Sequence, residues 1–353
     1  MAQARSPGGR HDRHGGRQDD APAALGVRGA LPRVHERARG AAAVLLLGRS
    51  LDAVPAGRVG GHRGRRDGRR REPAGLASHH SARAATGRRP GTDGHDAGVH
   101  LAARDHAAHC RALAVEVGRY VEAITGPDLS LPVPTCPGWD IAELVRHIGA
   151  VHRWAERMVR DGSIERLARA ELDLGLPPDV SGLPVWLASG GEALVATLRA
   201  ADPDASIWVW GADPHVRFWS RRMLHETTVH RADAELALGR DPAIDPDTAA
   251  DGIDELLENL PNAAYFAPKV AALRGDGESI RLDGTDVDVH WVVRLEPKGF
   301  TWARGRDDAS VRVSAPVADL LLLLYRRLPV ADARFACLGD HDVLARWLDN
   351  SAL

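Results

Sequence analysis

The stretch FWSRRMLHETTVHRADAELALG, residues 218–239, decides how the chain around it is organised. It reads as one helix, and steps of three or four residues along a helix place side chains on one face. That face carries a continuous row in which four of five residues are ionisable: Trp219, Arg222, Glu226, His230 and Asp233. An amphipathic helix normally turns apolar residues inward, so this polar row indicates a site as well as packing.

Within the row, Glu226 and His230 are four residues apart, one turn along the axis, as two ligands of one metal ion would be. A third ligand has to come from another part of the chain. The stretch PTCPGWDIAELVRHIGAVHRW, residues 134–154, offers a candidate. Asp140 with Glu143 three residues later is a capping-box signature, which predicts that a helix starts there.

On this second helix, His147 shares one face with four apolar residues and is expected to point toward the core. These residues are Leu144, Ile148, Val151 and Trp154. His152 lies well round the helix and is expected at the surface. A single histidine on an apolar face is more often a core residue than a ligand. Here, however, an imidazole from an antiparallel neighbour would complete a three-ligand site with Glu226 and His230.

Two imidazoles and one carboxylate leave coordination positions open for water or substrate, a pattern typical of a catalytic metal ion. Zn is the first choice for this divalent metal, while Fe(II), Ni(II) and Mn(II) stay open because the ligand set discriminates little among them. Cys136, just before the second helix, is either a reactive thiol or a packing residue.

Together, PTCPGWDIAELVRHIGAVHRW and RRMLHETTVHRADAELALG resemble the mycothiol-dependent maleylpyruvate isomerase family of actinobacteria, a branch of the DinB-like metal-binding four-helix bundles. That family has a Gly-Trp before a helix with a metal-binding histidine, and a Glu-x-x-x-His pair on a later helix. These features fall on His147, Glu226 and His230. The resemblance covers residues 99–353 and implies a mainly α fold, with the bundle over 99–240 and a smaller α/β (α+β) domain over 241–353.

The resemblance also implies a function. A cytoplasmic enzyme would use a divalent metal and mycothiol, a small thiol, to isomerise a maleyl-type small-molecule substrate. The metal-activated thiolate adds to the cis double bond, the resulting single bond rotates, and elimination returns the trans isomer. Arg222 is then the candidate for holding a substrate carboxylate, or else the ion-pair partner of Glu226. Asp233 would orient His230 as a hydrogen-bond acceptor.

Two other functions use the same ligands. One is a mycothiol S-transferase that conjugates the thiol to electrophiles, and the other is a non-catalytic metal- or thiol-binding protein. The expected assembly is a monomer or a homodimer. The three cysteines show neither a disulfide pattern nor structural zinc spacing, and no signal or membrane segment is apparent, which favours the cytoplasm.

The first part of the chain differs in composition from the rest. Residues 1–90 contain 19 Arg, no Lys and 7 acidic residues, whereas the rest contains 27 basic and 41 acidic residues, and no aromatic residue precedes Tyr120. Such a segment cannot easily bury enough apolar surface to offset its ordering entropy. Residues 1–98 are therefore expected to be a disordered or spurious extension, with Val99 as an alternative start. A nucleic-acid-binding arm is less favoured, because aromatic residues for base stacking are absent.

Other segments complete the expected fold. Residues 190–202 are expected to form a further helix, and Trp208, Trp210 and Trp219 to wall a pocket mouth or to pack in the core. After residue 239, an acidic linker leads into a helix. Strand-like alternation with Asp-Gly and Lys-Gly turn signals follows. It spans residues 279–284, 289–305 and 309–315. The apolar run 316–329 and residues 340–350 predict the last two helices.

Overall fold

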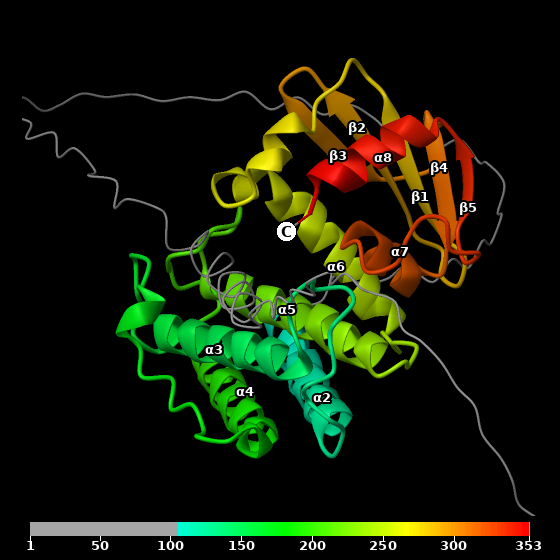
Figure 1. The fold of residues 1–353 in the computed structure, drawn as a ribbon. Helices are drawn as coiled ribbons and strands as arrows, with labels where there is room; N and C mark the ends of the chain where they lie inside the picture. The colour runs from blue at the N-terminus through cyan, green and yellow to red at the C-terminus, as the bar shows by residue number, and fades with distance from the viewer. Residues whose placement is uncertain (1–104, 353) are drawn as a thin grey trace, which may run out of the picture.

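The computed structural model describes residues 105–352, which form a helix bundle followed by a second unit built on a sheet (Figure 1). The bundle consists of α2 (His106–Ile124), α3 (Ile141–Arg160), α4 (Leu183–Ala200) and α5 (Val216–Ala237). The second unit contains the helices α6 (Pro246–Asn259), α7 (Val317–Leu324) and α8 (His341–Asn350). The extension predicted for residues 1–98 lies outside the described residues.

Helix α3 begins where the capping signature predicts. The Asp140 side chain accepts from the Glu143 amide at 2.7 Å, and the Glu143 carboxylate accepts from the Asp140 amide at 3.1 Å. Helix α3 packs against α4 and α5, and its early residues meet late residues of α5. The ring of His147 lies 5.1 Å from that of His230, and the ring of Trp154 lies 5.2 Å from that of Trp219. The two helices are therefore antiparallel.

Helix α4 begins at Leu183, seven residues before the predicted start at residue 190. Gly190 and Gly191 suggest a helix boundary in the sequence, yet they lie inside the helix. A Cβ atom on Gly191 would lie 2.5 Å from Val117 Cγ1 of α2. These glycines are therefore packing residues, because they allow α4 to approach its neighbours closely.

The sheet of the second unit has the strand order β3-β2-β1-β4-β5, and only β1 and β4 run parallel. The strands are β1 (Ser279–Gly284), β2 (His290–Glu296), β3 (Gly299–Arg304), β4 (Val311–Ala315) and β5 (Ala336–Gly339). Strand β5 was not predicted, because it is a short edge strand with mostly exposed residues and no apolar alternation. The predicted mainly helical fold followed by a mixed sheet with helices is confirmed.

Helix α5 belongs to both units (Figure 1). Its residues Trp219, Met223 and Leu224 pack in the core of the bundle, whereas Val229 and Ala232 pack in the core of the second unit. Since apolar contacts surround the helix, its polar residues are buried with it and need partners. None of the helices in residues 105–352 is long and apolar enough to cross a membrane.

Candidate metal centre

Three side chains from α3 and α5 meet in the bundle. Glu226 Oε1 lies 3.4 Å from His147 Nε2 and 3.5 Å from His230 Nε2. The three ligand atoms lie within 4.8 Å of one another. The antiparallel packing of α3 on α5 brings His147 opposite the Glu226–His230 turn, so the structure assembles the three residues that the sequence pattern selects.

Asp233 determines how His230 is oriented. The Asp233 carboxylate is fully buried and lies 2.8 Å from His230 Nδ1. It also accepts two bonds of 2.9 Å from Arg327 and one of 2.6 Å from the Thr135 hydroxyl. Because Nδ1 donates to this carboxylate, Nε2 of His230 is the nitrogen that faces Glu226 and His147.

Arg222 lies one turn before Glu226 and is only 4% exposed. It donates from Nη2 to Glu226 Oε2 at 2.9 Å and from Nη1 to Glu255 Oε2 at 2.7 Å. Burial by itself would lower the pKa of Arg222, but the two carboxylates and the Tyr325 hydroxyl hold it well above its usual value. Of the two roles open to Arg222 in the sequence, the structure contains the ion pair with Glu226.

In the absence of a metal ion, the three candidate ligands carry different charges from one another. Burial lowers the pKa of His147, so its imidazole is neutral and offers a lone pair. Burial would also lower the pKa of His230, but hydrogen bonds to Asp233, Cys136 and Glu226 hold this pKa well above its usual value. Burial would raise the pKa of Glu226, yet both histidines and Arg222 hold it well below normal. A metal ion would therefore displace a proton from His230.

This donor set fits a divalent metal. Two imidazole nitrogens and one carboxylate oxygen are ligands that Zn accepts, and the remaining positions would be open. Within residues 105–352, a second group of possible ligands consists of Cys136, His230 and Asp233. It fits a cation less well, because the Asp233 carboxylate already pairs with the Arg327 guanidinium, whose Nη2 also lies 3.9 Å from Cys136 Sγ.

The structure decides two expectations about individual side chains. His152 is completely buried instead of exposed, and its Nε2 lies 2.8 Å from Thr227 Oγ1. His152 lies on a different side of α3 from His147, but α5 covers that side of the helix as well. Trp219 is also fully buried in the bundle core and stacks near Trp208, with 6.2 Å between ring centroids. The core alternative therefore holds for Trp219.

Sequence reasoning missed the contribution of the second unit to this site. Tyr325 and Arg327, just after α7, and Glu255 of α6 all contact residues of the α5 row. The signal available in the sequence was weak. Two arginines follow the apolar run LLLLLY, and a glutamate lies among the other acidic residues of α6.

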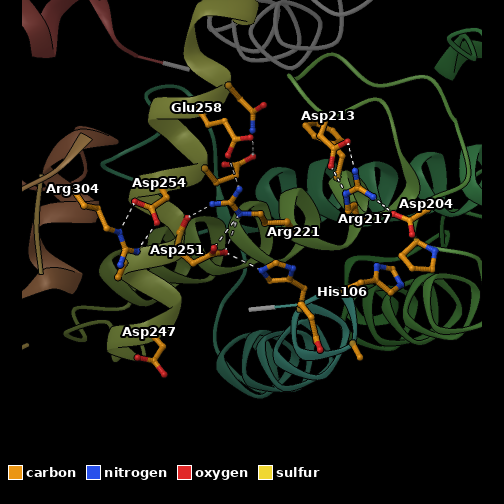
Figure 2. Close-up of a pocket in the computed structure, with 18 residues that line it drawn as sticks. His106, Asp204, Asp213, Arg217, Arg221, Asp247, Asp251, Asp254, Glu258 and Arg304 are labelled. Atoms are coloured by element: carbon orange, nitrogen blue, oxygen red, sulfur yellow. Dashed lines mark hydrogen bonds and ion pairs between the residues drawn. The ribbon is translucent and has the colours of Figure 1, made fainter. Parts of the chain in front are cut away.

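A cleft of about 810 Å³ lies elsewhere, between residues of α2, α5, α6 and β3 (Figure 2). Its charged residues are largely paired with one another. Arg221 donates to Asp251 and Glu258, and Arg304 donates to Asp254. The described residues that line it include none of the three candidate metal ligands. The cleft is therefore distinct from the candidate metal centre, although Glu255 also lines it.

Comparison with protein families identifies both parts of the chain. Residues 110–235 match the mycothiol maleylpyruvate isomerase N-terminal domain, and residues 247–346 match the C-terminal domain of the same family. This chain belongs to the mycothiol maleylpyruvate isomerase family. The resemblance seen in the sequence is thus confirmed, and the family match includes the three candidate ligands and Arg222.

Solved structures similar to this family member were also found. A crystal structure of a mycothiol-dependent maleylpyruvate isomerase is 14% identical, with a TM-score of 0.44, and the match covers 66% of this chain and 93% of that one. A mutant of a mycothiol-dependent maleylpyruvate isomerase is 13% identical, with a TM-score of 0.42 and coverage of 62% and 88%. A UbiJ-SCP2 ubiquinone synthesis protein is 17% identical, with a TM-score of 0.24 and coverage of 31% and 92%. No curated protein matched the chain.

Proposed function

We propose that this protein is a metal-dependent enzyme that uses mycothiol to isomerise a maleyl-type substrate from cis to trans. The observation that carries the proposal is the meeting of His147, Glu226 and His230, whose ligand atoms lie within 4.8 Å of one another in a member of this family. A structural role alone would not require two histidines and a carboxylate to converge around one point.

His147, Glu226 and His230 would hold the divalent metal, with Zn as the first candidate. The bound ion and thiol would supply nucleophilic addition to a cis double bond and the reverse elimination. The protein prepares the site for this chemistry. Burial keeps the His147 imidazole neutral, and Asp233 orients His230. These contacts preorganise two nitrogen ligands before any ion enters.

We assign Arg222 to the support of Glu226 rather than to direct binding of a substrate carboxylate. Its two Nη atoms are bonded to Glu226 and Glu255, and its side chain is buried. Releasing it toward a substrate would leave Glu255 buried without its cationic partner, which is costly. Asp233 is assigned to the support of His230 by the same kind of contact.

The proposal is tested by turnover of a cis-enedioate such as maleylpyruvate, with metal and mycothiol varied separately. Glu226→Gln should weaken metal binding, because an amide is a poorer ligand than a carboxylate. Its activity should follow metal occupancy, and added metal should recover a substantial part. The matched control is Glu235→Gln on the same helix, whose carboxylate pairs with Arg231 instead and whose loss should leave turnover unchanged.

Product analysis distinguishes the related functions. An S-transferase would consume mycothiol and release an adduct, whereas an isomerase would regenerate it. If the protein only binds metal or thiol, neither the wild type nor Glu226→Gln should show thiol-dependent turnover. Wild-type turnover that is unchanged when mycothiol is omitted would rule out the proposed reaction.

A further inference from the structure

A chain of buried charges connects α6 of the second unit to the candidate metal centre. Glu255 is 1% exposed, and its Oε2 accepts from Arg222 Nη1 at 2.7 Å. The other end of the same guanidinium donates to Glu226 Oε2 at 2.9 Å. Arg222 therefore bridges a carboxylate from each unit, and the Glu226 carboxylate is one of the three candidate ligands.

Glu255 is itself held in place from a second direction. Its Oε1 accepts from Asn259 Nδ2 at 3.2 Å, and Asn259 Oδ1 accepts from the Ala212 amide at 2.9 Å. Asn259 is 3% exposed, so little of this chain is open to water although both side chains line the cleft. Both ends of the Glu255–Arg222 pair are thus anchored, which gives the guanidinium one defined position beside Glu226.

This position of the Arg222 guanidinium gives the two carboxylate oxygens of Glu226 different partners. Oε2 is bonded to Arg222, whereas Oε1 faces His147 Nε2 and His230 Nε2. Glu255 also affects the net charge beside the candidate metal position. If Arg222 had Glu226 as its only anionic partner, the guanidinium would neutralise the charge that a metal ion requires there. With Glu255 present, the positive charge is shared between two carboxylates, and the group keeps a net negative charge.

We propose that Glu255 is a positioning residue for the metal centre, acting through Arg222 to keep Glu226 Oε1 directed at the metal position and its charge available. The inference rests on the proposed function, since it requires a metal ion at His147, Glu226 and His230. It gives the second unit a part in metal binding, whereas the three candidate ligands themselves all lie on helices of the bundle.

The same helix offers a matched control. Glu258 lies one turn after Glu255 and also pairs with an arginine of α5, since its Oε2 accepts from Arg221 Nη1 at 2.8 Å. Figure 2 shows Glu258 and Arg221 at the cleft, where Arg221 also binds Asp251. No bond of Arg221 to Glu226 is present among the described residues. Glu258→Gln therefore removes an ion pair between the same two helices, one whose side chains are more exposed, without touching the chain to Glu226.

The experiment measures the metal affinity of the full-length protein by competition with a chelator. Zn is the probe, and Co(II) reports ligand geometry through its visible absorption. Glu255→Gln should weaken Zn binding by about 10-fold, the lower end of the effect of losing a direct partner of a ligand, because Glu255 acts through Arg222. It should also change the Co(II) spectrum. Glu258→Gln should change neither, and Glu255→Asp, which keeps the charge, should recover part of the lost affinity.

Several results would overturn the inference. Zn affinity and a Co(II) spectrum in Glu255→Gln equal to those of the wild type would show that Glu255 only packs, even if the melting temperature falls. Should Glu255→Gln not fold, Arg222→Lys retains the positive charge but cannot bridge both carboxylates. Unchanged metal affinity in that variant would equally refute the bridge.

The same measurements separate this inference from the proposed function. Absence of Zn binding by the wild type, or full occupancy in His230→Ala, would refute the metal centre itself and the role of Glu255 with it. Tight wild-type binding that is lost in His230→Ala but retained in Glu255→Gln would refute only the positioning role.

Discussion

At the scale of single residues, burial and hydrogen-bond direction determine the charge of a side chain. The Thr227 hydroxyl donates to the Met223 carbonyl at 2.7 Å, so the bond between His152 and Thr227 must be donated by His152 Nε2. Its Nδ1 is buried and has no hydrogen-bond partner within the described residues. A proton there would have no acceptor, and burial lowers the pKa of His152 to about 3.

This pKa predicts a pH dependence of stability. Between the ordinary histidine value of about 6.5 and about 3, the unfolded chain binds a proton at His152 that the folded protein does not. Stability from this group is thus complete above pH 6.5 and falls as the pH decreases. In metal-free protein, His152→Gln should reduce the slope of unfolding free energy against pH by up to about 1.4 kcal/mol per pH unit.

Urea denaturation at several pH values between 6 and 4 measures this slope. The control is His341→Gln, which removes an exposed histidine at the start of α8 and should leave the slope unchanged. An identical slope for His152→Gln and wild type would contradict the assignment of His152 as a neutral buried group.

At the scale of elements, close packing of α3 against α4 sets the position of His147. Gly149 follows His147 by two residues, and a Cβ atom there would lie 2.0 Å from Cζ3 of Trp186 in α4. Trp186 is in turn fixed by its indole nitrogen, which donates to the Leu174 carbonyl at 2.8 Å. Gly149 therefore allows the close approach of α3 to α4, and this packing places His147 opposite α5.

Gly149→Ala should destabilise the protein despite the higher helix propensity of alanine. The clash with the Trp186 ring should cost about 1–3 kcal/mol, whereas the propensity gain is at most about 1 kcal/mol. Since α3 would shift, Zn affinity should fall as well. Urea denaturation and metal titration measure both effects.

Gly118→Ala is the matched control within α2. A Cβ atom at Gly118 meets no atom within 4 Å, so the substitution should stabilise the protein by about 0.5–1 kcal/mol. Stabilisation of both variants would show that α3 and α4 are less tightly packed than the structure indicates.

At the scale of the whole molecule, the two units are joined by charged contacts as well as by the shared helix α5. Arg222 binds Glu255 and Arg327 binds Asp233, and both pairs are largely buried. Breaking a buried pair by removing one partner is strongly destabilising. The bundle and the second unit are therefore stabilised by contacts with each other and are not independently packed.

The composition of the first segment leads to the last prediction. Residues 1–90 have no aromatic residue and a large excess of arginine over acidic residues, so they are expected to add little packed core. A protein that begins at His100 should melt at nearly the same temperature as the full-length chain. Thermal unfolding of both proteins tests this, and a large loss of stability on truncation would show that the segment packs against the rest.

Local patterns in the sequence were sufficient for the parts of this protein that depend on neighbouring residues. The four-residue spacing of Glu226 and His230 places them on one face of a helix wherever that helix packs, and the Asp140–Glu143 signature marks the start of α3. Periodicity likewise predicted the strands β1 to β4 and the helices α7 and α8. Glycines inside α4 and the short edge strand β5 escaped prediction, because their environment comes from packing and not from the local sequence.

Only the tertiary structure decided which charges meet. Glu255 lies 33 residues from Arg222, and Arg327 lies 94 residues from Asp233. No periodicity relates positions that far apart, since their contact depends on how α6 and α7 dock on α5. The buried state of His152 has the same origin. The sequence by itself therefore determined the candidate ligands and the family, whereas long-range packing determined which groups orient those ligands and balance their charge.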